Sequence, residues 1–438
     1  MKRRAGTATQ GKTEPPELRG MAAAWRQVVL PMVAGIVTTK KAMREWVTEF
    51  GMAALVGLME ADAERAVGCR KGAQQKNRRL SHWGYKGTPF PYDGRQVVLP
   101  RPRVRTVGKG RKGREVELPI VQHLQGIDPM AERVVEQILL GVSTRGYEQS
   151  LGPTTVGLAA RGAKKSRVSE MFVEETQRRV REHISEKLDQ LDLVAMLLDG
   201  LNVGGHAIVV GLGISREGTK HVLGLRQGST ENKVLCTELL QDFVGRGLKN
   251  GAGLLFVIDG GKGLRAAIRD VFGEGAIVQR CQQHKRRNVV EHLPVAQQKT
   301  VDRMLVDAYR SENLKTARKR LTQIISWLDR NGEEDAAGSL REGLEETLTV
   351  WKLELPEALR RFFATTNAIE NVMGTIRRVT RNVKRWRDGK MAKRWTALGL
   401  QEAGRRFKRI KGHRHLPALV AALARRAGMS VDQDTAIA

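Results

Sequence analysis

Cysteine, aromatic residues and acids are all scarce in this sequence. Only three of its 438 residues are cysteines, and Cys69, Cys236 and Cys281 are too few and too far apart for a disulfide framework or a four-ligand zinc site. The longest uncharged apolar run near the start, residues 28–37, is too short to cross a bilayer and begins too late for a signal peptide. These absences favour a reducing compartment and no membrane anchor, so we expect a cytoplasmic protein.

The shortage of acids leaves a large positive charge. Lysine and arginine number 76 against 47 aspartates and glutamates, a formal net charge of +29, while an apolar content of 41% suffices for folded cores. A protein with this surplus repels itself unless a polyanion neutralises it, and nucleic acid is the leading candidate because binding releases its counterions. The alternative is a surface over-charged for solubility. The length predicts about three domains of ordinary size.

The N-terminal part of the sequence predicts a tail and a helical region in 1–67, followed by a small basic β-containing segment in 68–125. Apolar residues recur at helical spacing over 39–67. Short strands are predicted at 95–100 and 114–119, with an Asp-Gly turn before the first. The loop between these strands is rich in Arg and Lys, and would either lie on a phosphate backbone or be simply solvated.

Residues 126–188 predict helices broken by glycines and ended by a long amphipathic helix. This succession fits a helix-turn-helix-like DNA-binding region whose last helix enters a major groove, although a generic helical connector has the same pattern. Three cations at the expected start of the last helix would contact phosphates: Lys164, Lys165 and Arg167.

Residues 189–282 have a different pattern. Three compact apolar runs separated by glycine-rich turns predict a three-stranded meander, and a helix, a strand, a second helix and a last strand follow. This is the element order of a ribonuclease H-like α/β core. Helical spacing without a strand pattern then fills 283–362, which predicts an all-helical insertion. A helix that completes the core is expected in 363–412, and a C-terminal tail in 413–438.

Three acids stand where this fold would bring them together. Asp199 is expected at the end of the first strand, Asp259 at the end of the fourth, and Glu370 at the head of the helix after the insertion. Such carboxylates can share hard divalent cations, which activate a hydroxyl for in-line phosphoryl displacement. Each acid has a structural alternative, since Asp-Gly pairs shape turns and Glu370 follows Asn367 at the spacing of a capping box.

The sequence behind Glu370 is strongly basic. From residue 371 to residue 415 there are 15 Lys or Arg and only two acids. A solvated basic face is one interpretation, but this excess over what solubility requires favours a DNA-gripping helix. The cations expected to hold DNA there are Arg377, Arg378, Arg381, Lys384, Arg385 and Arg387.

Four ordered stretches resemble the Mutator-type transposases of bacterial insertion sequences, a branch of the DDE recombinases: "LLDGLNV", "FVIDGGKGLRAAI", "VQRCQQHKRRNV" and "TTNAIENVMGTIRR". The resemblance covers most of 130–412. It implies a ribonuclease H-like core with a helical insertion, a catalytic and metal-binding triad of Asp199, Asp259 and Glu370, and two Mg²⁺ ions, for which Mn²⁺ could substitute. It also implies cleavage and strand transfer of double-stranded DNA at terminal inverted repeats by a homo-oligomer, at least a dimer, associated with the nucleoid.

The same resemblance places Cys281, His284 and Asn367 near the catalytic site. Cys281 and His284 match a C-x-x-H motif but are only half of a zinc site. Three interpretations stay open for them: packing near the site, orientation of a substrate phosphate by His284, or a purely structural pair. Trp327 and Trp351 could stack on an extruded base, although tryptophans at helical spacing also fit a core.

Two further functions compete with an active transposase. One is a catalytically silent DNA-binding regulator, which would tolerate a damaged triad. The other is a ribonuclease H-like nuclease or resolvase that cuts without joining. The intact set of three acids favours the active enzyme over the regulator, whereas the sequence does not separate cutting from joining.

Overall fold

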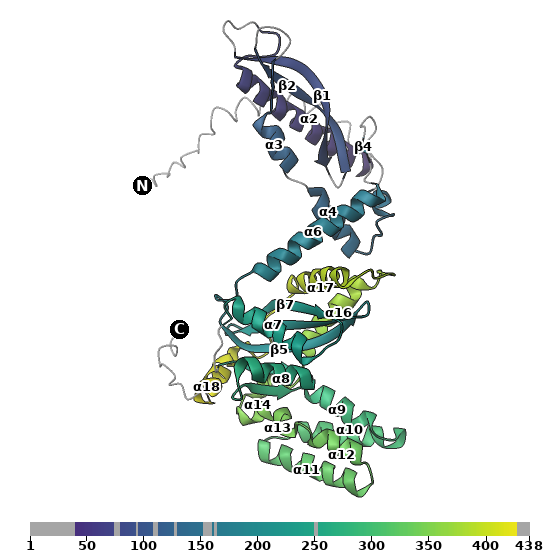
Figure 1. Ribbon diagram of the computed structural model, residues 1–438, viewed down its shortest axis with the longest axis vertical. Coiled ribbons are helices and arrows are strands. Elements are labelled where there is room, and N and C mark those ends of the chain that lie inside the picture. Colours follow the sequence, from purple (N-terminus) through teal and green to yellow (C-terminus); the bar gives the residue numbers. More distant parts are fainter. Residues whose placement is uncertain are drawn as a thin grey trace, which may run out of the picture. The chain divides into compact units, whose positions relative to one another are not determined.

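A computed structural model of the chain describes residues 40–73, 79–92, 95–107, 113–126, 129–151, 160–161, 164–248 and 253–426 (Figure 1). The chain divides into two compact units. The first comprises Met1–Gln137 and Val142–Ser169, and the second Ile138–Gly141 and Glu170–Ala438. Within the described ranges, no helix combines the length and the apolar character that a membrane span requires. The apolar run at 28–37 lies outside these ranges.

The first unit is built on a long helix packed against a β-ribbon. Helix α2, Lys40–Val67, confirms the predicted helix, and buried Met52, Met59 and Ala63 contact inward residues of the ribbon such as Val104. The ribbon pairs β1 with β2 in antiparallel register, and two short strands join β2 on its other side. Their bounds are β1 Leu80–Tyr92, β2 Arg95–Thr106, β3 Glu115–Val116 and β4 Ala160–Arg161.

The predicted strand at 95–100 is confirmed, but it continues to Thr106. Three of the arginines assigned to a loop, Arg101, Arg103 and Arg105, therefore lie on β2, and the first two bind the carboxylate of Glu115 at 2.8 and 2.7 Å. The predicted strand at 114–119 shrinks to two residues, and the Asp-Gly turn at 93–94 lies outside the described residues.

The region predicted to be helix-turn-helix-like is described only in part. The last helix, α6, spans Lys165–Ser185, close to the prediction, but the residues before it form β4, which pairs with β2. Most of the connection between the preceding helix and α6 lies outside the described residues, so the predicted turn is not described. Lys164 precedes α6, and Lys165 and Arg167 lie exposed in its first turn. The preceding helices are α3 Pro119–Gly126, α4 Pro129–Leu139 and α5 Tyr147–Ser150.

The second unit contains a five-stranded sheet with the strand order β7-β6-β5-β8-β9. β5, β6 and β7 are antiparallel, whereas β8 and β9 run parallel to β5. The order of elements along the chain is the one predicted. Their bounds are β5 Leu193–Val203, β6 His206–Ser215, β7 Lys220–Gly228, α7 Lys233–Gly245, β8 Leu255–Ile258, α8 Lys262–Phe272 and β9 Ile277–Arg280.

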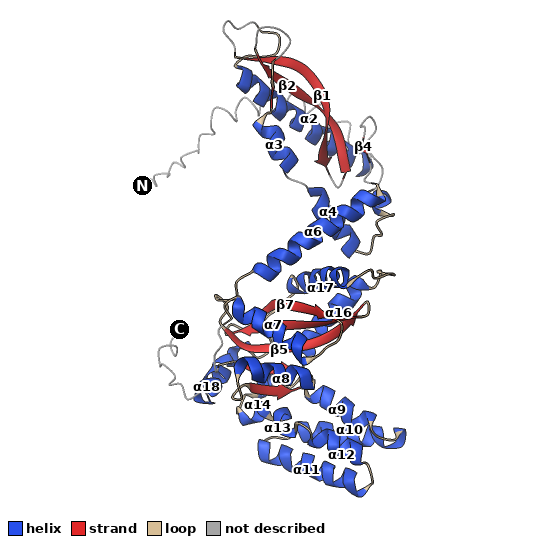
Figure 2. Cartoon of the chain, in the orientation of Figure 1, coloured by secondary structure: helices blue, strands red, loops and turns tan. Residues whose placement is uncertain are grey.

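Helices cover both faces of this sheet (Figure 2). Along β5, Met196 and Leu198 pack with residues of α7 and α8, while Ala195 and Leu197 belong to the opposite core. The division follows the two-residue period of a strand, which sends successive side chains to opposite faces. The second face is covered by residues of α16 and α17, described below, and shares its core with the helical segment.

Residues 282–363 are helical throughout, in agreement with the pattern of the sequence. Gln279 of β9 anchors this segment, because its amide donates to the Thr347 carbonyl and accepts from the Val350 amide, both at 2.9 Å. Trp351 is only 7% exposed and lies in the core, whereas Trp327 is half-buried. The helices are α9 Gln282–Glu291, α10 Val295–Tyr309, α11 Leu314–Arg330, α12 Glu334–Arg341, α13 Leu344–Thr347, α14 Thr349–Lys352 and α15 Glu357–Phe363.

Two predictions for the C-terminal part are wrong. The basic helix behind Glu370 ends at Thr380, and the chain then runs without regular structure to Asp388. Residues 413–426 are not a tail, since they fold into η1 and α18, with Leu419 fully buried. The elements are α16 Asn367–Thr380, α17 Gly389–Gly404, η1 His413–His415 and α18 Leu416–Arg426.

Candidate catalytic carboxylate site

The parallel pairing of β5 and β8 places Asp199 beside Asp259. Leu198 pairs with Ile258, and each aspartate is the next residue of its chain. Asp199 falls in the same phase as Ala195 and Leu197, so it belongs to the face that α16 covers. It does not close its strand as predicted, because β5 continues to Val203 and pairs there with β6.

One carboxylate oxygen of each aspartate accepts a hydrogen bond from a backbone amide. The Gly200 amide donates to Asp199 Oδ1 and the Gly261 amide to Asp259 Oδ1, both at 2.9 Å. The contact of Asp259 with the amide two residues on is the turn interaction expected of an Asp-Gly pair. Asp259 therefore has the turn-forming role that was the structural alternative in the sequence.

Asp199 is the most deeply buried of the three acids, with 8% of its surface exposed. Burial raises its pKa to about 7, repulsion from Asp259 and more weakly from Glu370 adds to the rise, and His284 opposes it. Desolvation and neighbouring negative charge both disfavour the ionised form. Asp199, Asp259 and Glu370 thus interact electrostatically although they are far apart along the chain.

Glu370 lies in the first turn of α16, as predicted, but not in a capping box. The N-cap residue of α16 is Thr366, and its side chain makes no capping hydrogen bond. Instead, Thr366 Oγ1 donates to Glu370 Oε1 at 3.1 Å. Asn367, the residue expected to cap the helix, is its first residue and is exposed.

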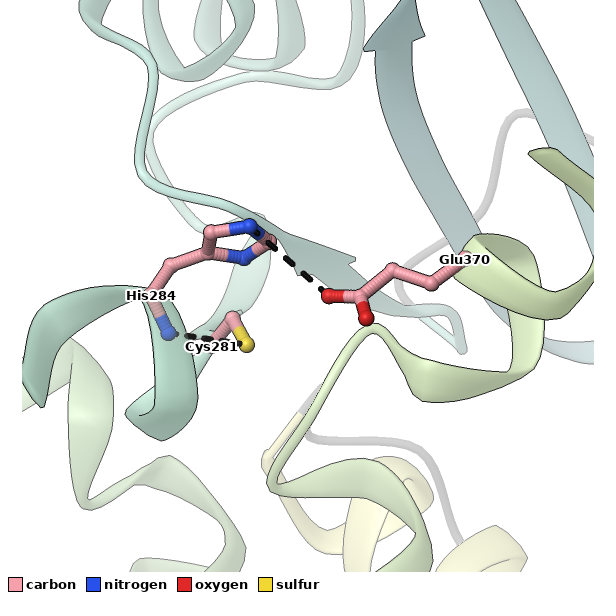
Figure 3. A group of neighbouring side chains, drawn as sticks. All are labelled: Cys281, His284 and Glu370. Atoms are coloured by element: carbon pink, nitrogen blue, oxygen red, sulfur yellow. Dashed lines mark hydrogen bonds and ion pairs between the residues drawn. The ribbon is translucent and has the colours of Figure 1, made fainter. Parts of the chain in front are cut away.

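Cys281 and His284, at the start of α9, lie next to Glu370 of α16 (Figure 3). His284 Nε2 is 3.7 Å from Glu370 Oε1, and one ligand atom from each of the three residues lies within 4.8 Å of the others. A hydrogen bond with Cys281 is the largest cause that raises the pKa of His284, to about 9, against the effect of burial. The Cys281 amide donates to the Ile258 carbonyl at 2.7 Å, which ties α9 to the end of β8.

Two residues of this site were not predicted from the sequence. One is Thr366, which is fully buried among Cys281, His284 and Glu370. The other is Glu231, which precedes the N-cap of α7 and whose carboxylate lies over Gly200. Burial of this carboxylate and repulsion from Asp259 raise the pKa of Glu231. The family-like stretch "TTNAIENVMGTIRR" contains Thr366 without indicating its role, and the position of Glu231 results from packing between distant elements.

The predicted DNA contacts lie on the surface that follows this site along the chain. Arg377 and Arg378 are exposed in the last turn of α16. The irregular connection after the helix exposes Arg381, Lys384, Arg385 and Arg387, and its half-buried Trp386 packs over Gly204 in the β5–β6 turn. The cations are thus exposed as predicted, but only two of them belong to the helix.

The second unit is therefore an α/β domain in which β5, β8 and α16 contribute Asp199, Asp259 and Glu370 to one region of the sheet. The model of the family described as "Transposase, Mutator family" matches residues 31–409, and the chain belongs to this family of insertion-sequence transposases.

Named relatives agree with this assignment. The chain is 32% identical to a transposase for insertion sequence element IST2 of Acidithiobacillus ferrooxidans over 40% of its own length and 58% of that protein. It is 25% identical to a transposase for ISRM5 of Rhizobium meliloti (strain 1021), covering 74% of this chain and 79% of the relative. With a transposase for ISRM3 of the same organism, the match spans only half of the relative, at 29% identity.

Proposed function

We propose that this protein is a DNA transposase that binds the terminal inverted repeats of its own insertion sequence and catalyses metal-dependent cleavage and strand transfer. The observation that carries the proposal is the register of β5 and β8, which sets Asp199 beside Asp259 on the face covered by α16 and Glu370. Membership of an insertion-sequence transposase family supports DNA at the element ends as the substrate of this site. The strand order and the connections of the sheet support a ribonuclease H-like core with residues 282–363 as its helical insertion.

The donor set fits hard divalent cations. Asp199, Asp259 and Glu370 offer oxygen ligands, and their mutual repulsion, visible at Asp199, would be relieved by positive charge between them. These residues would hold two Mg²⁺ ions, or Mn²⁺ in their place. When bound, such ions activate an attacking water or 3′-hydroxyl and stabilise the leaving oxygen of a phosphodiester.

The protein's own side chains would perform the remaining tasks. Exposed arginines at the end of α16 and in the connection after it would grip the DNA backbone. In the other unit, the exposed cations at the start of α6 would also contact phosphates. His284, which carries a proton over a wide pH range, would face a substrate phosphate near Glu370. Because cleavage and joining at two element ends require two sites, we propose that the protein acts as a homo-oligomer on DNA.

Labelled DNA carrying the element ends, incubated with the protein and Mg²⁺, tests this proposal. Strand-transfer product in which the element's 3′ ends are joined to target DNA is the expected result. Cut DNA without joined product would instead assign a nuclease or resolvase, and bound but uncut DNA a silent regulator. Each of the amide variants Asp199→Asn, Asp259→Asn and Glu370→Gln should abolish formation of the strand-transfer product.

A further inference from the structure

Thr366 breaks a local rule of helix formation. A threonine at an N-cap position normally accepts a hydrogen bond from an amide of the first helical turn. The Thr366 hydroxyl makes no such bond, although the residue occupies the N-cap of α16 and is fully buried. Departures of this kind are expected where a side chain serves another purpose.

The Thr366 hydroxyl lies within hydrogen-bond distance of three residues of the candidate site. Thr366 Oγ1 lies 3.1 Å from Glu370 Oε1, 3.3 Å from His284 Nδ1 and 3.4 Å from Cys281 Sγ. A hydroxyl has one proton to donate and two lone pairs. The carboxylate is the closest partner and can only accept, so the proton goes to Glu370, while Nδ1 of His284 can donate to the hydroxyl oxygen.

Cys281 fixes the position of the threonine. Its sulfur accepts from the Thr366 amide and from the His284 amide, both at 3.4 Å, and its own amide donates to Ile258, the residue before Asp259. A second bond, from the Gln282 amide to the Ala364 carbonyl at 2.9 Å, holds the same two segments together. A continuous set of hydrogen bonds therefore runs from the end of β8 through the start of α9 to the start of α16.

We propose that Thr366 is a positioning residue: its hydroxyl orients the Glu370 carboxylate toward Asp199 and Asp259, and Cys281 and His284 hold the hydroxyl in place. The inference rests on the proposed function, since it gives Glu370 the role of a metal ligand. A free glutamate at the head of a helix has several rotamers, and only some direct its oxygens toward the two aspartates. Partners behind a metal ligand typically change metal affinity or activity by about 10- to 100-fold when removed.

The test compares Thr366→Val with Thr366→Ser. Valine keeps the shape and removes the hydroxyl, whereas serine keeps the hydroxyl and removes only the methyl group. The full-length proteins are titrated with MgCl₂, once in the DNA cleavage assay and once without DNA by following the melting temperature. Thr366→Val should require about 10-fold or more Mg²⁺ for half-maximal response in both titrations, and Thr366→Ser should stay within a few-fold of wild type.

The neighbouring Thr365→Val is the matched control, because Thr365 is half-buried and lines a cleft whose described lining includes none of Asp199, Asp259 and Glu370. It should leave both titrations unchanged. If Thr366→Val does not fold, Thr366→Ala is compared with Thr366→Ser in the same titrations. Equal Mg²⁺ requirements in the variants with and without the hydroxyl would overturn the positioning role. The role would also be overturned if the wild-type protein contained one zinc ion per chain and only Cys281→Ala released it.

The variant Glu370→Gln distinguishes a failure of the Thr366 role from a failure of the proposed function. If Glu370→Gln cleaves and joins DNA like wild type, the catalytic assignment itself fails. If Glu370→Gln is inactive while Thr366→Val keeps the wild-type Mg²⁺ requirement in both titrations, only the role of Thr366 is lost.

Discussion

The carboxylate of Glu231 occupies the space in which a side chain at Gly200 would stand. A Cβ atom on Gly200 would overlap both the carboxylate oxygens and the carboxyl carbon of Glu231. Gly261, after the second aspartate, is also close to Glu231, at 3.8 Å from its Oε1 to a Cβ position. Gly200 thus leaves room for a further acid beside the aspartate pair, whereas a Cβ atom at Gly261 would meet Glu231 only at an ordinary contact distance.

This relationship predicts that Gly200→Ala displaces Glu231. We expect a stability loss of about 1–3 kcal/mol, the usual cost of overpacking, together with a weaker response of the melting temperature to Mg²⁺. Chemical denaturation with and without MgCl₂ measures both. Gly245→Ala is the control, since a Cβ there meets no atom within 4 Å and should not lower the stability. A fully stable Gly200→Ala protein with normal Mg²⁺ response would contradict the packing described.

A second prediction concerns pH. The Asp199 carboxyl has a pKa of about 7 in the folded protein against an ordinary value of 3.8, so the native state holds this proton to higher pH than the unfolded chain does. Stability of the metal-free protein should therefore fall as pH rises from about 4 to 7, because the unfolded state binds fewer protons there. The loss is on the order of a few kcal/mol, at about 1.4 kcal/mol for each pKa unit.

Thermal or urea unfolding in EDTA, with wild type compared to Asp199→Asn, isolates this contribution. The variant should lack the decline between pH 4 and 7. His284 adds a decline of the same sign at higher pH, since its pKa is raised from 6.5 to about 9 and the stabilisation is lost as pH passes through that upper value. Added Mg²⁺ should restore wild-type stability at pH 8 but not that of Asp199→Asn. Parallel curves for the two proteins would refute the assignment.

The sequence predicts the positions of those site residues that depend on the strand pattern and on strand pairing. The continuous apolar run of β5 predicts a buried strand, and the parallel pairing with β8 brings Asp199 next to Asp259. Strand β1 was missed because its glycines and prolines read as turns, although pairing with β2 and packing on α2 stabilise it. Thr366 and Glu231 escaped prediction for a related reason, as only contacts between distant elements give them their places.

A third prediction separates chemistry from binding. Asp259→Asn should abolish cleavage of labelled element ends while the affinity for those ends stays within a few-fold of wild type. The amide keeps the shape of the side chain and its hydrogen bond from the Gly261 amide, but it is a weaker ligand for a hard cation. Cleavage assays and gel-shift titrations on the same DNA measure the two effects. An equal loss of binding and cleavage would show that Asp259 supports the DNA-binding fold rather than the reaction.

The final prediction concerns the exposed arginines at the end of α16. Arg377→Ala combined with Arg378→Ala should weaken binding to all DNA sequences and make it less sensitive to salt, because each lost phosphate contact reduces the slope of log affinity against log salt by about 1. Binding titrations at several NaCl concentrations, on an element end and on unrelated DNA, provide the measurement. Lys315→Ala combined with Lys319→Ala removes the same charge from exposed positions on α11 and should change the slope less. A loss confined to the element end would identify the arginines as readers of base sequence instead of phosphate contacts.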